Sequence, residues 1–281
     1  MKKIIMMVIV LLLTVGCSSV QKESGRGITQ GEVGQDEPIK RSQAAKMLAL
    51  FVYDTATIEN MERTINFVDT DMSKPYDKYI NAAFRAGLIS GADETHFEPD
   101  AYLSLEQATF LLKKLDKSAT LQLKYNHEDR KKPISAAMWT EIYERAAQLN
   151  GNSAISSNTI IPYASGNTCS ELGERFVVTD MGLLSVECCN FNYTDCTLSA
   201  LVRDKEILAV KSVVNTSPSV TGAVVMKTDE KGAFVDMGGV ERYFYTEKDI
   251  NLRTGENIAF TYNGSIITAV EKTIPQSAEL N

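Results

Sequence analysis

The spacing of apolar residues changes once along this chain, near residue 150, and the change limits what each half can fold into. Before it, apolar residues recur three and four positions apart, as in Ile39–Phe51, which is the period of one face of a helix. After it, short runs alternate apolar and polar residues between turn signals, as in Ile258–Tyr262. We therefore expect an α+β protein with two domains, a helical domain over 38–150 and a β-rich domain over 160–273.

The β-rich domain is expected to form an antiparallel sandwich or a small barrel, because its strands are short and closely spaced. Asn263-Gly264 between two alternating runs is a strong hairpin signal. By strand count, the stretch from Val220 onward fits a compact barrel of the SH3 or OB kind. The polar stretch Asn150–Asn158 separates the two domains, and 274–281 is a tail. The expected strands are 175–179, 183–188, 198–202, 207–214, 221–227, 232–237, 242–246, 258–262 and 265–270.

The first seventeen residues have the layout of a secretion signal. A basic start, Met1-Lys2-Lys3, precedes the apolar run Ile4–Leu13, which is shorter than the ~20 residues of a membrane-spanning helix. The sequence that ends in Gly16-Cys17 resembles the lipobox of bacterial lipoproteins, with Thr14 in place of the usual aliphatic residue. The resemblance implies that the signal peptide 1–16 is removed and that Cys17 carries the lipid. An ordinary signal peptide with an incidental cysteine is the alternative.

A lipid on Cys17 implies a location outside the cytoplasm, on the cell membrane and facing the cell wall, because two or more acyl chains anchor a protein stably. Residues 17–37 are polar and rich in glycine, which is typical of a flexible tether. The formal net charge of −7 argues against nucleic acid as a partner and against docking on anionic lipid through a basic surface.

The four other cysteines, Cys169, Cys188, Cys189 and Cys196, lie in one window of the sequence. Outside the cytoplasm such a cluster favours disulfides, and four cysteines allow three pairings. A bond between Cys188 and Cys189 would be a strained ring, so Cys169 and Cys196 are each expected to pair with one of them. Free thiols are the next alternative. Zinc is the last, because no CxxC or CxxH spacing is present.

Residues 67–115 carry a series of motifs in a fixed order. The motifs are Phe67-x-Asp69, the helical run Tyr79-Ile80-Ala83, Gly87-Leu88-Ile89-Ser90-Gly91, Phe97-x-Pro99 and Leu103-Ser104-Leu105-Glu106-Gln107-Ala108. Ser104 and Gln107 form a capping-box pattern at the second helix. In this order the motifs resemble a known repeat, the S-layer homology (SLH) domain, which implies helix-loop-helix repeats in a degenerate SLH-type helical bundle over 38–150. Ile39–Phe51 resembles the second half of a preceding repeat, and the run from Ile134 resembles a third.

In this family three repeats pack around a pseudo-threefold axis, and grooves between them bind secondary polysaccharide of the Gram-positive cell wall. One arginine per repeat clamps an acidic group of that glycan through paired hydrogen bonds. The chain keeps it as Arg41, while Leu105 and Ala136 replace it in the other repeats. One alternative is that glycan binding is weak or absent and the helices are a structural module. For Arg41 alone, the alternative is a surface salt bridge. The candidate glycan-binding residues are Lys40, Arg41, Gln43 and Gly91.

No catalytic residues, metal site or cofactor is predicted. The nucleophile-elbow, zinc-protease, P-loop and dinucleotide motifs are missing from the sequence. Asp69-x-Asp71 opens like a calcium loop, but Lys74 and Ile80 stand where that loop needs glycine and glutamate. Tyr243-Phe244-Tyr245 is a possible carbohydrate-stacking surface, although alternation predicts a buried Phe244 between two ordinary strand tyrosines.

These features together predict a non-enzymatic cell-envelope lipoprotein that associates with secondary polysaccharide or peptidoglycan of the cell wall. SLH segments followed by β-rich regions also resemble the front portion of proteins with a stage II sporulation protein D-like domain, which remodels peptidoglycan. An accessory or targeting relative of those proteins is therefore one alternative. A scaffold for protein partners without glycan binding is the other.

Overall fold

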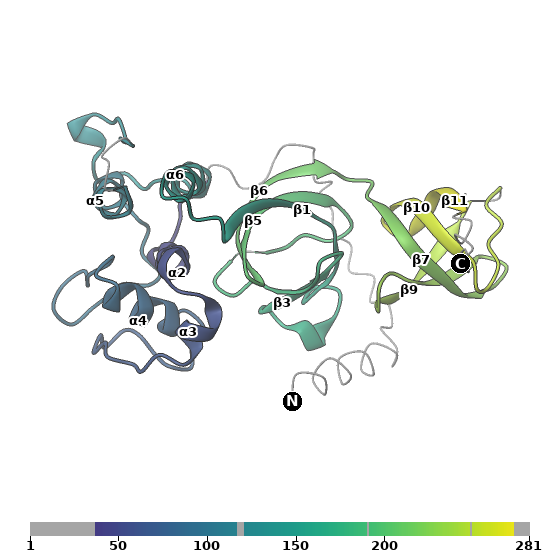
Figure 1. Ribbon diagram of the computed structural model, residues 1–281, viewed down its shortest axis with the longest axis horizontal. Helices are drawn as coiled ribbons and strands as arrows, with labels where there is room; N and C mark the ends of the chain where they lie inside the picture. Colours follow the sequence, from purple (N-terminus) through teal and green to yellow (C-terminus); the bar gives the residue numbers. More distant parts are fainter. Residues whose placement is uncertain (1–36, 117–120, 190, 248, 273–281) are drawn as a thin grey trace, which may run out of the picture.

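The computed structural model describes residues 37–116, 121–189, 191–247 and 249–272. Helices, a six-stranded sheet and a five-stranded barrel follow one another along the chain and along the longest axis of the molecule (Figure 1). Within the described residues, no helix combines the length and the apolar content needed to cross a membrane. The α-helices are α2 (Arg41–Val52), α3 (Thr55–Glu59), α4 (Asp77–Arg85), α5 (Leu105–Leu115) and α6 (Ala136–Leu149).

Three short segments meet at the centre of the helical part, each directly before a helix. The backbone N–H of Ile39 donates to the carbonyl of Ile134 (3.1 Å), that of Ile134 to Leu103 (2.9 Å), and that of Leu103 to Ile39 (3.0 Å). These three hydrogen bonds close a ring, which we call the central ring, and α2, α5 and α6 start immediately after its members. The structure therefore confirms that the three segments occupy equivalent positions around a pseudo-threefold axis.

The capping box predicted for α5 is present. Ser104 Oγ accepts from the backbone N–H of Gln107 (3.2 Å), and Gln107 Oε1 accepts from the backbone N–H of Ser104 (3.0 Å). At α2, Gln43 Oε1 accepts from the backbone N–H of Lys40 (2.9 Å), so both helices start with a side chain that satisfies an otherwise unpaired backbone donor.

The first sheet has the strand order β1-β5-β6-β4-β3-β2. Ile161 alone separates β1 from β2, so the pair is one bent strand whose first half borders β5 and whose second half borders β3. The sequence did not reveal β1, because only its end residues Ile155 and Ile160 are buried and the polar residues between them resemble a linker. The strands are β1 (Ile155–Ile160), β2 (Pro162–Ser165), β3 (Phe176–Thr179), β4 (Gly182–Ser185), β5 (Thr197–Arg203) and β6 (Glu206–Asn215).

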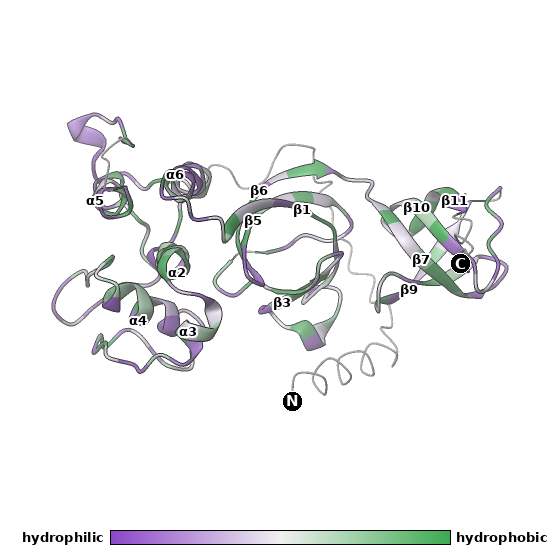
Figure 2. Ribbon diagram, viewed as in Figure 1, coloured by the Kyte–Doolittle hydropathy of each residue, from purple (hydrophilic) through white to green (hydrophobic). Residues whose placement is uncertain are grey.

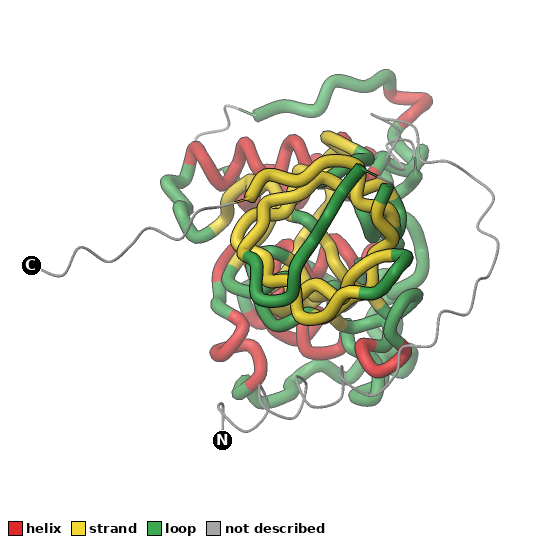
Figure 3. The backbone as a smooth tube through the Cα atoms, turned by 90° about the vertical axis from the view of Figure 1, so that its right-hand side faces the viewer, coloured by secondary structure: helices red, strands yellow, loops and turns green. Residues whose placement is uncertain are grey.

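The second sheet is a closed barrel with the order β10-β11-β9-β8-β7, as expected for the stretch from Val220. Asn263 ends β10 and Gly264 opens the turn to β11, where Gly264 has φ +57°, a conformation that glycine adopts readily. In the view along the long axis, strands form a ring in front of the helices (Figure 3). The strands are β7 (Ser219–Thr228), β8 (Gly232–Asp236), β9 (Glu241–Thr246), β10 (Asn257–Asn263) and β11 (Ile266–Lys272).

The two sheets share one connectivity when β1 and β2 count as a single strand. In both sheets, the first strand in chain order lies beside the second and the fourth. The fifth strand lies parallel to the third, which pairs β6 with β4 in the first sheet and β11 with β9 in the second. This is the connectivity of the OB kind of barrel, so the β-rich region contains two such units instead of one. The expectation of purely antiparallel pairing is wrong at these two pairs. A closed ring with an odd number of strands cannot alternate direction throughout, so one parallel pair is required.

Apolar side chains connect the three parts of the molecule, and hydrophobic residues gather on the strands (Figure 2). The core of the helical part includes Ile155, Leu201 and Leu208 of the first sheet. The core of the second barrel includes Tyr163 and Val178 of the first sheet. The first sheet is therefore held on both sides by buried apolar contacts.

Lys46 is the main polar link between the helices and the first sheet. Its side chain is 1% exposed, and Nζ lies 2.8 Å from Glu206 Oε2 and donates to the carbonyls of Glu187 (2.5 Å) and Ile207 (3.2 Å). Burial alone would lower the pKa of Lys46, but the neighbouring Cys189 and the Glu206 carboxylate together outweigh it and the pKa is raised. The ammonium group therefore stays charged inside the interface.

We predict that Lys46→Met lowers the free energy of unfolding by about 3–5 kcal/mol, because it leaves the Glu206 carboxylate buried without a partner. The double variant Lys46→Met/Glu206→Leu should recover part of this loss. Urea denaturation followed by circular dichroism measures both, with Lys113→Ala on the exposed side of α5 as the control. A double variant less stable than Lys46→Met would contradict the charge-imbalance explanation.

Candidate functional site

Arg41 lies at the start of α2 and points into the loop that follows α4. Its Nε donates to the carbonyl of Phe97 (2.8 Å), Nη2 donates to the carbonyl of Ser90 (3.4 Å), and the guanidinium lies 4.7 Å from the centre of the Phe97 ring. The residue is 8% exposed. Burial lowers the pKa of Arg41, while the carboxylates of Glu98 and Asp69 act in the opposite direction. Arg41 is therefore a buried support for this loop, and neither a surface salt bridge nor an open carboxylate clamp.

Asp69 holds the same loop from the other side. Its Oδ1 accepts from the backbone N–H of Phe97 (2.8 Å), and its Oδ2 accepts from that of Glu98 (2.6 Å). Glu98 has φ +59°, which is costly for a residue other than glycine, and the two charged hydrogen bonds offset that cost. The Phe-x-Asp and Phe-x-Pro motifs are thus two halves of one loop structure.

Gly91 is required by the packing of this loop. A Cβ atom there would lie 2.2 Å from the carbonyl oxygen of Asp93 and 2.7 Å from the Phe67 ring. The rings of Phe67 and Phe97 lie 5.8 Å apart, so the glycine makes room for an aromatic contact beneath the loop. Gly91 therefore serves the fold of the loop, and it lies next to Ser90, which Arg41 contacts.

Lys40 is the one cation among the four candidate residues that is well exposed. Its Nζ lies 2.8 Å from Asp100 Oδ1, and the two side chains are 45% and 75% exposed. The neighbouring Gln43 uses Oε1 to cap α2. The structure thus brings Lys40, Arg41 and Gln43 to one place beside Gly91, but only Lys40 presents its charge to solvent.

The positions that correspond to Arg41 follow from a second set of backbone hydrogen bonds around the axis. In each case a backbone N–H donates to a carbonyl that lies two residues before the next member of the central ring. The pairs are Arg41 to Ala101 (2.8 Å), Leu105 to Lys132 (2.9 Å) and Ala136 to Glu37 (2.7 Å). Leu105 and Ala136 therefore stand where an arginine would stand, as the sequence alignment of the repeats predicts.

A charged cluster that the sequence did not reveal lies between α4 and the first sheet. The Glu187 carboxylate is 3% exposed, with Oε2 2.8 Å from Lys78 Nζ and Oε1 2.5 Å from Arg175 Nη2. Burial would raise the pKa of Glu187, but Lys78 and Arg175 outweigh it and the pKa is lowered. These residues line a depression, yet the carboxylate is already clamped by cations of the chain itself. No sequence signal marked this cluster, because its members come from distant segments.

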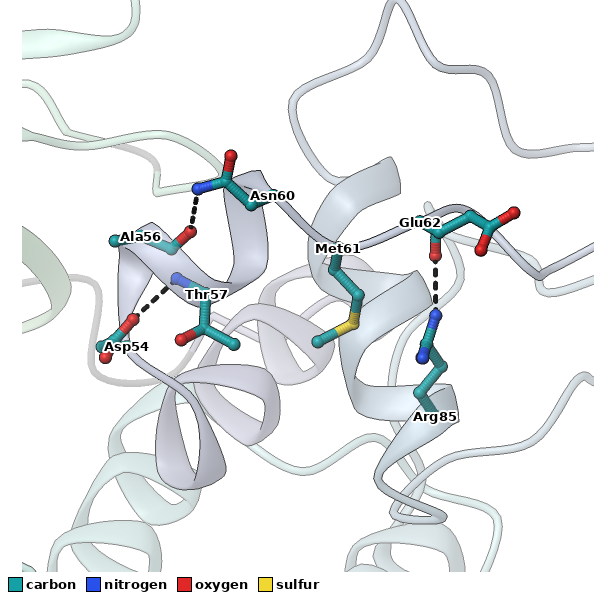
Figure 4. A pocket seen from close by; sticks show the side chains of 7 residues that line it. All are labelled: Asp54, Ala56, Thr57, Asn60, Met61, Glu62 and Arg85. Carbon is teal, nitrogen blue, oxygen red and sulfur yellow. Dashed lines mark hydrogen bonds between the residues drawn. The ribbon is translucent and has the colours of Figure 1, made fainter.

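A shallow pocket beside α3 is lined by residues that hydrogen-bond to one another (Figure 4). Thr57 N donates to Asp54 Oδ1 (2.7 Å), and Arg85 Nη1 donates to the carbonyl of Glu62 (3.0 Å). Within the described residues, no group of three or more His, Cys, Asp or Glu side chains could hold a metal ion. Neither finding supplies a chemical site.

The structure does not support the predicted disulfides, since no disulfide joins the four cysteines of the described β-rich region. Distribution over different cores separates Cys169 and Cys188 from each other and from the other two cysteines. Cys169 belongs to the core of the second barrel, and Cys188 packs against the helical core. Cys189 and Cys196 both belong to the core of the first sheet, where Cys189 Sγ donates to the carbonyl of Ile207 (3.1 Å). Burial raises the pKa of Cys188 and of Cys196 to about 12.

Residues 66–109 match the family model of the S-layer homology domain. The match covers the Phe67 loop, α4, the loop around Gly91 and Phe97, and the start of α5, which is the region whose motifs are described above. The chain therefore contains an S-layer homology domain, a module that associates proteins with the cell surface or cell wall outside the cytoplasm. No curated protein matches the chain.

We predict that Asp69→Asn destabilises the protein by about 2 kcal/mol, because hydrogen bonds to a charged acceptor contribute about 1.5–3 kcal/mol. Asp71→Asn is the matched control. Asp71 is an exposed turn residue that accepts from Ser73 N (2.8 Å), and its change should cost less than about 0.5 kcal/mol. Thermal unfolding compares the two, and equal losses would contradict the role given to Asp69.

Proposed function

We propose that this protein is a non-enzymatic cell-envelope lipoprotein that is anchored in the membrane through Cys17 and associates with cell-wall secondary polysaccharide through its helical part. The observation that carries the proposal is the central ring together with the S-layer homology match over 66–109. Cys17 and the tether up to residue 36 lie outside the described residues, so the anchor rests on the lipobox resemblance alone.

The surface that we assign to the glycan lies at the start of α2, next to the loop around Phe97. Lys40 supplies its accessible charge. The exposed ion pair of Lys40 with Asp100 is weak, because solvent screens both partners, so a carboxylate on an acidic sugar can replace Asp100. Arg41 contributes indirectly, since it holds the Phe97 loop in place. Binding is accordingly weaker than that of a domain with an open arginine in each repeat.

The test is binding of the protein to purified sacculi before and after removal of the secondary polysaccharide. Lys40→Ala should weaken binding about fivefold, the equivalent of about 1 kcal/mol for an exposed ion pair, and Asp100→Asn should strengthen it. The matched control is Lys132→Ala, which removes a similar exposed pair with Asp129 (2.7 Å) next to Leu105, where the arginine is missing. This control should bind like the wild type.

Two results would replace the proposal with one of its alternatives. Binding that survives removal of the secondary polysaccharide supports recognition of peptidoglycan, as expected of an accessory relative of stage II sporulation protein D-like proteins. No binding to either preparation supports a scaffold for protein partners.

The lipid anchor is tested separately. Cys17→Ser should leave the protein unprocessed or release it into the medium, because the acceptor of the lipid is lost and the remaining chain has no other anchor in this proposal. Fractionation of cells with immunoblotting measures this, with Ser18→Ala as the control. Membrane retention of Cys17→Ser at the wild-type level would rule out lipid anchoring through this residue.

A further inference from the structure

Three aromatic side chains form an exposed patch on the outer face of β8 and β9. Phe234 and Tyr245 are 37% and 50% exposed, and Tyr243 is partly exposed between them. The ring centres of Phe234 and Tyr243 lie 5.0 Å apart, and those of Tyr243 and Tyr245 lie 5.2 Å apart. We call these three residues the aromatic patch. Phe244 is fully buried, as alternation predicts, but the two tyrosines are not isolated strand residues.

The local backbone keeps this patch open. Phe234 lies directly opposite Tyr243 in the β8–β9 pairing, whereas Tyr245 lies opposite Gly232, which has no side chain to cover it. The Tyr243 hydroxyl donates to Asp229 Oδ1 (2.9 Å), which fixes the middle ring. Burial and this carboxylate raise the pKa of Tyr243 to about 12, so the hydroxyl remains a donor at neutral pH.

The first sheet shows what the equivalent face looks like when protein covers it. Its corresponding strands, β3 and β4, carry Phe176, Val178 and Leu183 outward, and all three pack against the core of the second barrel. That face is aliphatic apart from one ring and contains no tyrosine. The aromatic patch instead has two tyrosines, whose rings have an apolar face and a polar edge and therefore suit a surface that is wet when empty. This difference favours a polar ligand over a permanent protein contact.

The charges at the patch favour a ligand without charge. Lys227 lies opposite Phe234, and Lys231 lies in the adjacent turn, but Asp229 and Glu230 lie in the same turn. Phosphate polymers and other polyanions are bound where cations are in excess, and here the two signs balance. Sugars without charged groups offer apolar C–H faces to aromatic rings and hydroxyl groups to a carboxylate such as Asp229.

We propose that the aromatic patch is a second glycan site, which binds an uncharged segment of a wall glycan across β8 and β9. The same face of OB barrels binds oligosaccharides in other proteins. The second barrel lies at the opposite end of the molecule from the helices (Figure 1), so this site is separate from the surface at Lys40. The cell-wall location is the only part of the proposed function on which this inference rests.

The test uses the full-length protein and chitotetraose, an uncharged tetramer of N-acetylglucosamine, in isothermal titration calorimetry. The wild type should bind with millimolar affinity or better, and Tyr245→Ala and Phe234→Ala should each weaken binding at least tenfold. Tyr245→Phe keeps the ring and should bind within about threefold of the wild type. Phe110→Ala removes a ring that is 56% exposed on α5 and serves as the matched control.

Three outcomes would overturn this inference. They are absence of wild-type binding, equal binding by Tyr245→Ala, and concentration-dependent self-association in sedimentation velocity that Tyr245→Ala abolishes, since the patch would then face a second copy of the chain. Lys40→Ala separates the two glycan sites. It should leave chitotetraose binding unchanged even where it lowers binding to sacculi, so either site can fail without the other.

Discussion

The central ring is the constraint on which the helical part depends. Its hydrogen bonds join backbone groups of Ile39, Leu103 and Ile134, so they place few demands on the side chains around them. For this reason a repeat can lose other features and still keep its position around the axis. The described residues between α5 and α6 include no counterpart of α4 and its loop, and yet Ile134 closes the ring as the other two residues do.

A second constraint fixes the ring relative to the β-rich region. Lys46 brings one charge from α2 into the first sheet, where Glu206 and two carbonyls surround it. A buried ion pair adds little net stability but disfavours any arrangement that leaves one charge alone. Together with the shared apolar cores, this contact fixes the helices on one side of the first sheet, and the second barrel lies at the opposite end of the molecule (Figure 1).

Much of this architecture could be predicted from the sequence because it depends on local patterns. The capping box at Ser104, most strands and the burial of Phe244 follow from spacing, whereas the equivalence of the three ring segments follows from the resemblance to the SLH repeat. The strand β1 could not be predicted, because its polar residues face solvent and resemble a linker. The role of Lys46 also could not, because a lysine within a helix normally marks its exposed side. Both failures come from contacts between segments that are distant in the chain.

The single retained arginine has a physical explanation once its contacts are known. Arg41 donates to carbonyls of the loop at Ser90 and Phe97, which belongs to the one helix-loop half described in this chain. Leu105 faces the segment that ends at Lys132, whose described residues contain no such loop, so an arginine there would lack the loop carbonyls that Arg41 contacts. The arginine is therefore kept where there is a loop to support. The single arginine of this motif thus coincides with the single helix-loop half among the described residues.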